Sequence, residues 1–153
     1  MLKSKKSDMF IVSLAKVSRN PTKASIELAK RLNNMLASCK NRDKKYKKET
    51  YITIDMLREL VITAIGTKCK YCNEIITHKN ISMDHIKPLS LDGQSTIDNI
   101  QFICKTCNRR KDKMSDNEFI ELNKFLDTLS EPSRKMILQK LSMGGFNASY
   151  KKK

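Results

Sequence analysis

The residues best suited to chemistry lie between positions 69 and 111 of this 153-residue chain. Four cysteines form two Cys-x-x-Cys pairs, Cys69 with Cys72 and Cys104 with Cys107. Two thiolates at this spacing can wrap around one metal ion, and two such pairs complete a tetrahedral site that is closed to water. The pattern therefore predicts a structural zinc ion with four thiolate ligands. The alternative interpretation is four buried free thiols.

Asp84 and His85 lie between the two cysteine pairs, in a predicted strand over residues 81–86. A neutral imidazole can accept a proton from water near neutral pH, and a carboxylate is a hard oxygen ligand for Mg²⁺ or Mn²⁺. Adjacent strand residues point to opposite faces. The strand must therefore end or twist at this pair if both side chains are to approach one phosphate. The alternative is that His85 has a structural role.

One cysteine and one histidine remain outside these patterns. Cys39 lies on an apolar helical stripe, so we interpret it as a core thiol rather than a reactive one. His78 could replace one cysteine as a metal ligand, but it lies in a polar loop and we expect it to be exposed.

Periodic apolar residues, caps and turn residues predict five helices and two strands. Asn20 and Pro21 mark the start of the first helix, and a second spans about residues 54–65 behind a Thr53 cap. A strand over residues 100–103 precedes a short helix from Cys107. The last two helices begin at the capping box Ser115-x-x-Glu118 and at Ser130. The predicted buried positions are Ile26, Ala29, Leu32, Met35, Leu36 and Cys39 in the first helix, and Phe119, Leu122, Phe125, Leu126 and Leu129 in the fourth.

The chain is strongly basic, with 31 Lys and Arg against 16 acidic residues and a net charge of +15. Residues 1–50 hold 14 of the basic and 4 of the acidic residues, a net of +10. Such a field attracts phosphate backbones or anionic lipid surfaces. No apolar run approaches the roughly 18 residues of a membrane span, and the apolar stretch 10–15 is short for a signal peptide. We therefore expect an intracellular protein in a reducing compartment, which favours metal-bound cysteines over disulfides.

The segment D-H-I-K-P-L-S-L-D-G-Q-S-T-I-D-N-I-Q-F-I-C-K-T-C-N-R-R-K resembles the HNH nuclease motif of the ββα-metal class, within residues 66–114. The resemblance implies an α+β fold, in which a mostly helical chain surrounds a small ββα-metal core stapled by the four-cysteine zinc site. It implies that His85 is the general base and that Asp84 binds the catalytic metal. Asn99 would hold the loop that orients His85. Asn108 stands where many members have a histidine, and its amide oxygen favours Mg²⁺ or Mn²⁺ as the catalytic ion.

On this basis the chain divides into a basic, largely helical N-terminal arm (1–50), an HNH core (51–114), packing helices (115–145) and a basic tail (146–153). The run 40–48 is almost purely charged, so we expect it to stay in solvent or on DNA and to govern affinity rather than chemistry. We also expect the helix after the second cysteine pair to contact the phosphates. The predicted nucleic-acid contacts are Lys44, Lys45, Lys47, Lys48, Arg109, Arg110, Lys111 and Lys113.

The resemblance implies a metal-dependent endonuclease that hydrolyses phosphodiester bonds of double-stranded DNA, by nicking or by cutting both strands. Two alternatives stay open. The first is a zinc-stapled DNA- or RNA-binding protein without catalysis, and the second is a nuclease subunit that acts only within a larger complex. As a small HNH-like protein, the chain is similar to free-standing HNH proteins of phages and mobile elements. A partner complex from a phage or mobile element is therefore a hypothesis by analogy. The sequence does not predict an oligomeric state.

Overall fold

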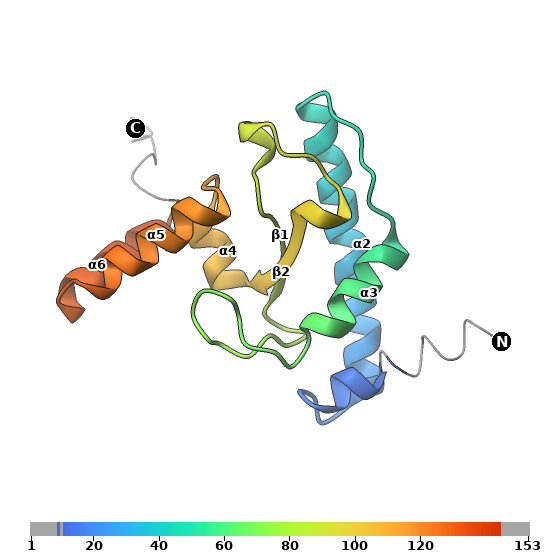
Figure 1. Ribbon diagram of the computed structural model, residues 1–153. Helices are drawn as coiled ribbons and strands as arrows, with labels where there is room; N and C mark the ends of the chain where they lie inside the picture. Colours follow the sequence, from blue (N-terminus) through green and yellow to red (C-terminus); the bar gives the residue numbers. More distant parts are fainter. Residues whose placement is uncertain (1–8, 10, 145–153) are drawn as a thin grey trace, which may run out of the picture.

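Helices surround a two-stranded sheet in the computed structural model, which describes residue 9 and residues 11–144 (Figure 1). This arrangement confirms the predicted α+β class. In chain order the elements are α2 (Pro21–Lys45), α3 (Ile54–Ala64), β1 (Ile81–His85), η1 (Leu89–Leu91), η2 (Ile97–Asn99), β2 (Ile100–Cys104), α4 (Lys105–Lys111), α5 (Asp116–Asp127) and α6 (Glu131–Ser142).

The two strands and α4 form a ββα unit. β1 and β2 are antiparallel, and their register places Asp84 opposite Gln101 and His85 opposite Ile100. β1 ends at His85, as expected if both members of the Asp84–His85 pair are to reach one site. α4 follows β2 without a loop, with Cys104 as its N-cap, so this helix begins two residues earlier than predicted.

The long helix α2 begins as the sequence predicts, because the Asn20 side chain accepts a hydrogen bond from the backbone N–H of Lys23. Its buried face differs from the expected one. Ile26 is 55% exposed, because the inward face contains instead the residues Ala24, Leu28, Leu32, Cys39 and Asp43. These residues recur mostly at intervals of four, which places them on one side of a helix. The charged run 40–48 therefore continues this helix as far as Lys45 and buries one carboxylate, that of Asp43.

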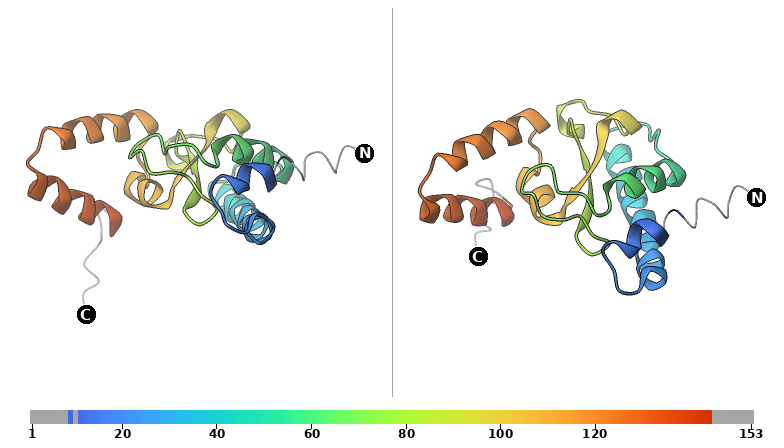
Figure 2. Two further views of the ribbon diagram at one scale, coloured as in Figure 1. Left: turned by 90° about the horizontal axis from the view of Figure 1, so that it is seen from below. Right: turned by 60° about the horizontal axis from the view of Figure 1, so that its bottom comes forward.

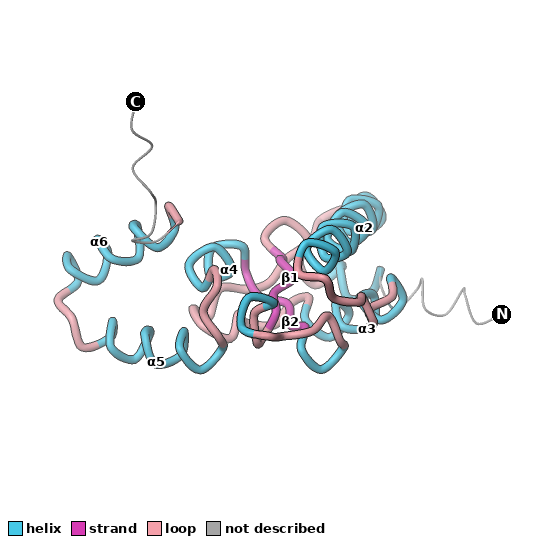
Figure 3. The backbone as a smooth tube through the Cα atoms, turned by 90° about the horizontal axis from the view of Figure 1, so that it is seen from above, coloured by secondary structure: helices cyan, strands magenta, loops and turns pink. Residues whose placement is uncertain are grey.

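α2 shares one hydrophobic core with the ββα unit. Leu28 and Leu32 of α2 pack in the same buried cluster as Val61 of α3, Ile81 of β1 and Ile103 of β2. The strands lie between α2 and α3 on one side and α4 on the other, and α5 and α6 form a hairpin beyond α4 (Figures 2 and 3). The N-terminal arm is thus packed onto the predicted nuclease core.

The helical hairpin is joined to this core at its base. Ser115 and Glu118 form the predicted capping box. Phe119 is buried with its ring edge against Tyr71, whereas Phe125 is 56% exposed, contrary to its predicted burial. The predicted basic tail, 146–153, lies outside the described residues. Within the described part of the chain, the helices lack the length and apolar character needed to cross a membrane.

Candidate active site and metal centre

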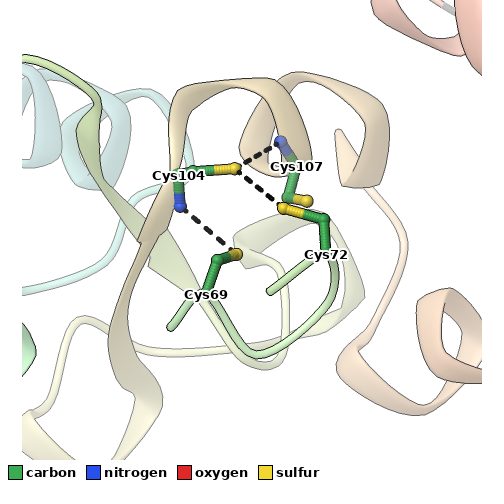
Figure 4. Close-up of side chains that lie close together, drawn as sticks. All are labelled: Cys69, Cys72, Cys104 and Cys107. Carbon is green, nitrogen blue, oxygen red and sulfur yellow. Dashed lines mark hydrogen bonds between the residues drawn. The ribbon is translucent and has the colours of Figure 1, made fainter. Parts of the chain in front are cut away.

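The four paired cysteines lie together where β2 meets α4 (Figure 4). Their sulfur atoms all lie within 4.8 Å of one another, and each cysteine is free. The sulfurs of Cys72 and Cys104 are 3.5 Å apart, far beyond the roughly 2.05 Å of a disulfide bond. The cluster could therefore hold a metal ion such as zinc, as the paired spacing predicts.

Backbone N–H groups already point at the sulfurs of this cluster. The N–H of Cys104 donates to the sulfur of Cys69, and the N–H of Cys107 donates to the sulfur of Cys104. Hydrogen bonds from Cys104 and Cys107 lower the pKa of Cys69, whereas hydrogen bonds with Cys104 and Cys69, together with burial, raise the pKa of Cys107. Four neighbouring thiols cannot all ionise without a cation, because the thiolates repel one another. A bound divalent cation would offset this repulsion.

A second group of polar residues lines a hollow of about 190 Å³ beside the sheet. Asp84 and His85 come from the end of β1, and Asn108 comes from α4. Arg42 of α2 and the exposed Lys113 also line this hollow. Three of the four residues predicted for the catalytic site are therefore brought together, with two cations beside them.

Asp84 is only 5% exposed and is held by two side chains. The Nζ atom of Lys111 lies 3.0 Å from its Oδ2 atom and donates to Oδ1 at 3.3 Å, and Nε2 of Gln101 donates to Oδ2 at 2.9 Å. Burial raises the pKa of Asp84, and the contacts with Gln101 and Lys111 oppose that shift. A carboxylate can accept about four hydrogen bonds, so Asp84 keeps acceptor capacity toward the hollow that it lines.

Lys111 does not face solvent, which corrects its prediction as a phosphate contact. Its side chain is 0% exposed. Besides the pair with Asp84, its Nζ atom donates to the backbone oxygen of His85 at 2.8 Å. A buried ammonium needs such partners, because an unpaired charge in the interior is costly.

The amide group of Asn108 is oriented by its donor side. Nδ2 of Asn108 donates to Oγ of Ser82 at 2.7 Å and to the backbone oxygen of Met83 at 3.4 Å. These bonds use the nitrogen and leave Oδ1 as the group that can coordinate a hard cation. Asp84 and Asn108 thus offer a donor set that suits Mg²⁺ or Mn²⁺.

Asn99 lies away from the hollow and joins two parts of the loop that follows β1. Its Oδ1 atom accepts from the backbone N–H of Lys87 at 2.8 Å, while Nδ2 donates to the backbone oxygens of Lys87 and Gln94. The side chain therefore closes this loop. A role in orienting His85 through the loop stays a prediction.

His85 is 5% exposed, and its Nε2 atom lies 2.9 Å from Oγ of Ser95. Burial lowers the pKa of His85 to about 4, with the positive charge of Arg42 as the next cause. The imidazole is therefore neutral at pH 7. A neutral ring has a lone pair that can accept a proton from water.

Two buried polar residues behind His85 were missed in the sequence. Oγ of Ser95 donates to Oδ1 of Asp43 at 2.7 Å and lies 3.1 Å from the sulfur of Cys39. Cys39, Asp43 and His85 could by residue type hold a metal ion, but the Ser95 hydroxyl already contacts all three. Asp43 is the single acidic residue in the run 40–48, which is the one signal that could have drawn attention to it.

Two of the other predicted nucleic-acid contacts, Lys48 and Arg110, already bind side chains of the protein itself. Lys48 pairs with Asp92 at 2.7 Å, and Nε of Arg110 donates to Oγ of Ser142 on α6. Four lysines and one arginine of the predicted set are exposed on the described surface: Lys44, Lys45, Lys47, Arg109 and Lys113.

His78 is 6% exposed, contrary to its predicted exposure. Its ring packs against α2, where Nε2 lies 3.8 Å from the Glu27 carboxylate. His78 is absent from both the cysteine cluster and the hollow that contains His85.

Comparison with known families supports the same region of the chain. Residues 69–123 match the HNH endonuclease family, so the suspected resemblance is confirmed over the segment that contains both cysteine pairs, Asp84, His85 and Asn108. The match indicates nuclease activity that uses a metal and acts on nucleic acid. No curated protein matches the chain. The match begins after α2 and α3, so it does not include Asp43.

Proposed function

We propose that this protein is a metal-dependent HNH endonuclease that hydrolyses phosphodiester bonds of double-stranded DNA, with His85 as the general base. The observation that carries the proposal is that Asp84, His85 and Asn108 line one hollow, with Arg42 and Lys113 beside them. An acid–base group, two hard oxygen ligands and two cations are the parts that phosphodiester hydrolysis requires.

Each residue has a distinct task in this proposal. Asp84 and Asn108 would hold a Mg²⁺ or Mn²⁺ ion through oxygen atoms. When bound, that ion would neutralise charge on the scissile phosphate and on the leaving 3′ oxygen. His85 takes a proton from water, and the resulting hydroxide attacks phosphorus as the bond to the 3′ oxygen breaks. The 3′ oxygen then takes up a proton from solvent. The products are a 5′-phosphate and a 3′-hydroxyl.

The exposed cations would position the substrate. Arg42 and Lys113 border the hollow, and Lys44, Lys45 and Lys47 continue past it along the end of α2. Phosphate contacts fix position and register without reading the bases. We therefore propose a nuclease with little intrinsic base specificity, whose affinity depends strongly on salt.

The four-cysteine cluster would hold zinc in a structural role. Four thiolates leave no open position for water or substrate. The cluster joins the turn after α3 to the junction of β2 and α4, so zinc would fix α4 and hence Asn108 relative to β1. Catalysis and zinc binding are thus assigned to separate sites within one ββα unit.

Cleavage of supercoiled plasmid tests the proposal directly. Wild type should convert the plasmid when Mg²⁺ or Mn²⁺ is added and not when it is withheld. His85→Ala should lose about 10²–10⁴-fold in rate, the usual contribution of a general acid or base. His78→Ala is the matched control, because it removes the chain's other histidine, which lies outside the hollow, and it should cleave at the wild-type rate.

The alternative assignments give different results in the same assay. A protein that binds the plasmid but leaves it intact at every metal concentration would be a binding module or a subunit that needs a partner. Cleavage that survives in His85→Ala would refute the assignment of the base. Parallel reactions on RNA and single-stranded DNA test the proposed preference for duplex DNA.

A further inference from the structure

We propose that Asp43 and Ser95 are positioning residues for His85, and that they fix its ring so that Nδ1 is the atom that takes the proton. The inference rests on the proposed function and adds the N-terminal helix α2 to the active site. Asp43 belongs to the last turns of α2, and Ser95 belongs to the loop between the strands.

Counting hydrogen atoms determines the direction of each bond. A serine hydroxyl has one hydrogen, and a carboxylate can only accept. Oγ of Ser95 lies 2.7 Å from Oδ1 of Asp43, so its hydrogen goes to Asp43. The same oxygen lies 2.9 Å from Nε2 of His85, and with its hydrogen already donated it must accept there. Nε2 therefore carries the ring proton, and the lone pair of the neutral imidazole lies on Nδ1.

Asp43 is itself held by several donors. Its Oδ2 atom accepts from Oγ1 of Thr50 at 2.5 Å, and the thiol of Cys39 lies 3.6 Å from the same oxygen. Asp43 is 1% exposed and Ser95 is 0% exposed. A buried chain in which each hydrogen has an acceptor allows little rotation, so the orientation of the imidazole is set before substrate binds.

The backbone of His85 is held as well. Its oxygen accepts from the ammonium of Lys111 at 2.8 Å. The carboxylate of Asp43 is connected through Ser95 to Nε2 of His85, whereas Nδ1 is the nitrogen that would meet water. When Nδ1 takes the proton, the ring becomes a positively charged imidazolium. The negative charge of Asp43 stabilises that imidazolium, so the arrangement also favours the proton transfer.

Two measurements test this inference, and the first leaves His85 and the residues around it unchanged. Long-range ¹⁵N–¹H spectra of the imidazole rings report which nitrogen carries the proton. The chain has 2 histidines, so His78→Gln assigns the signals. We expect His85 in the wild-type protein at pH 7 to carry its proton on Nε2. A proton on Nδ1 would overturn the inference whether or not the protein is a nuclease.

The second measurement separates positioning from binding and from folding. Ser95→Ala should lower kcat by roughly 10–100-fold through misplacement of the base, with KM and DNA affinity unchanged. Thr50→Val is the matched control, because it also removes one hydroxyl from the Asp43 carboxylate but does not touch His85. It should lose much less kcat than Ser95→Ala, because the Ser95–His85 bond stays in place. Both variants are compared at a temperature at which each is folded.

The failures are distinguishable. If His85→Ala cleaves like wild type, the assignment of His85 as the general base fails, and the ring spectra still decide the tautomer. If His85→Ala is inactive but Ser95→Ala retains the wild-type kcat, the proposed function stands and the positioning role is refuted. Equal losses in Ser95→Ala and Thr50→Val would also refute it, since the effect would then be on the stability of the buried cluster.

Discussion

Replacing Lys111 with Met should destabilise the protein without weakening its proposed salt-dependent binding to DNA. The ammonium is 0% exposed and lies 3.0 Å from the Asp84 carboxylate, which is 5% exposed. Met keeps the apolar stem but leaves Asp84 as a buried charge without its cation. Removing one partner of such a pair costs about 3–5 kcal/mol, more than the pair itself contributes.

Urea denaturation with zinc present measures this loss. For a slope of about 2 kcal/mol per M, typical of a small domain, the midpoint should fall by roughly 1.5–2.5 M. Lys113→Met is the matched control, because Lys113 is exposed two residues further along, and a surface change of this kind usually stays within about 0.5 kcal/mol. In DNA binding the larger effect should come from Lys113→Met. Losing one phosphate contact should flatten its plot of log affinity against log salt by about 0.9, whereas Lys111→Met should leave that slope unchanged.

The double variant Lys111→Met/Asp84→Asn checks the cause. Removing the stranded carboxylate charge should restore part of the stability that the single variant loses, because the penalty lies in the unpaired charge. If Lys111→Met unfolds at the wild-type midpoint and flattens the salt dependence as Lys113→Met does, then Lys111 faces DNA. The original sequence-based prediction would in that case be correct and the buried ion pair wrong.

Three further predictions concern the metal, the loop and pH. Removing zinc with a chelator should unfold the ββα unit, because metal-binding energy is folding energy in such sites; metal analysis should find about one tightly held zinc per chain, and an unchanged circular dichroism spectrum after zinc removal would contradict this. Gly93→Ala should reduce stability by about 1–3 kcal/mol and should also reduce the cleavage rate. The reason is that a Cβ atom at this position would meet the backbone oxygen of Lys87 at 1.9 Å, in the loop that leads to Ser95. A variant with wild-type melting and activity would show that the loop is not constrained in this way. Because burial lowers the pKa of His85 to about 4, the unfolded chain binds a proton between about pH 6.5 and pH 4 that the folded chain does not, so stability rises with pH across this window. Up to about 3 kcal/mol present above pH 6.5 should be lost toward pH 4, and His85→Gln, measured in the same buffers, should lack this part of the slope.

The features that the sequence predicted well are those encoded by short spacings. The Cys-x-x-Cys pairs, the Asn20 and Thr53 caps and the Ser115 capping box all depend on residues within about three positions of one another. Local geometry alone fixes such contacts. The α+β class followed from the resemblance to the HNH motif, and the two short strands between helical patterns agree with it.

The features that the sequence did not predict are contacts between distant segments. Asp43 and Ser95 are 52 residues apart in the chain, and Arg31 donates to backbone oxygens of His78 and Lys79 in the turn before β1. Nothing in the spacing of either partner indicates the other. His78 was expected in solvent for the same reason, since its burial depends on α2 lying against a polar loop.

Helical periodicity nevertheless carried part of this information. Lys111 follows the buried Cys107 by four residues, and Asp43 follows the buried Cys39 by four. Residues at this interval share one face of a helix, so both charged side chains continue an inward stripe. Both charged runs were interpreted as solvent-facing surfaces. One residue in each run, Asp43 and Lys111, nevertheless lies on the buried face of its helix.

These two buried charges meet the Asp84–His85 pair from different helices. Lys111 of α4 holds Asp84 and the backbone of His85, while Asp43 of α2 reaches the His85 ring through Ser95. Burying charge lowers stability unless each group is paired, and here each charge contacts a residue of the proposed site. In the proposed site the N-terminal helix α2 therefore does more than bind DNA, the single role that the +10 net charge of residues 1–50 first suggested. Deleting this helix would remove the carboxylate behind the proposed general base together with the basic surface, and cleavage should be lost even at saturating DNA.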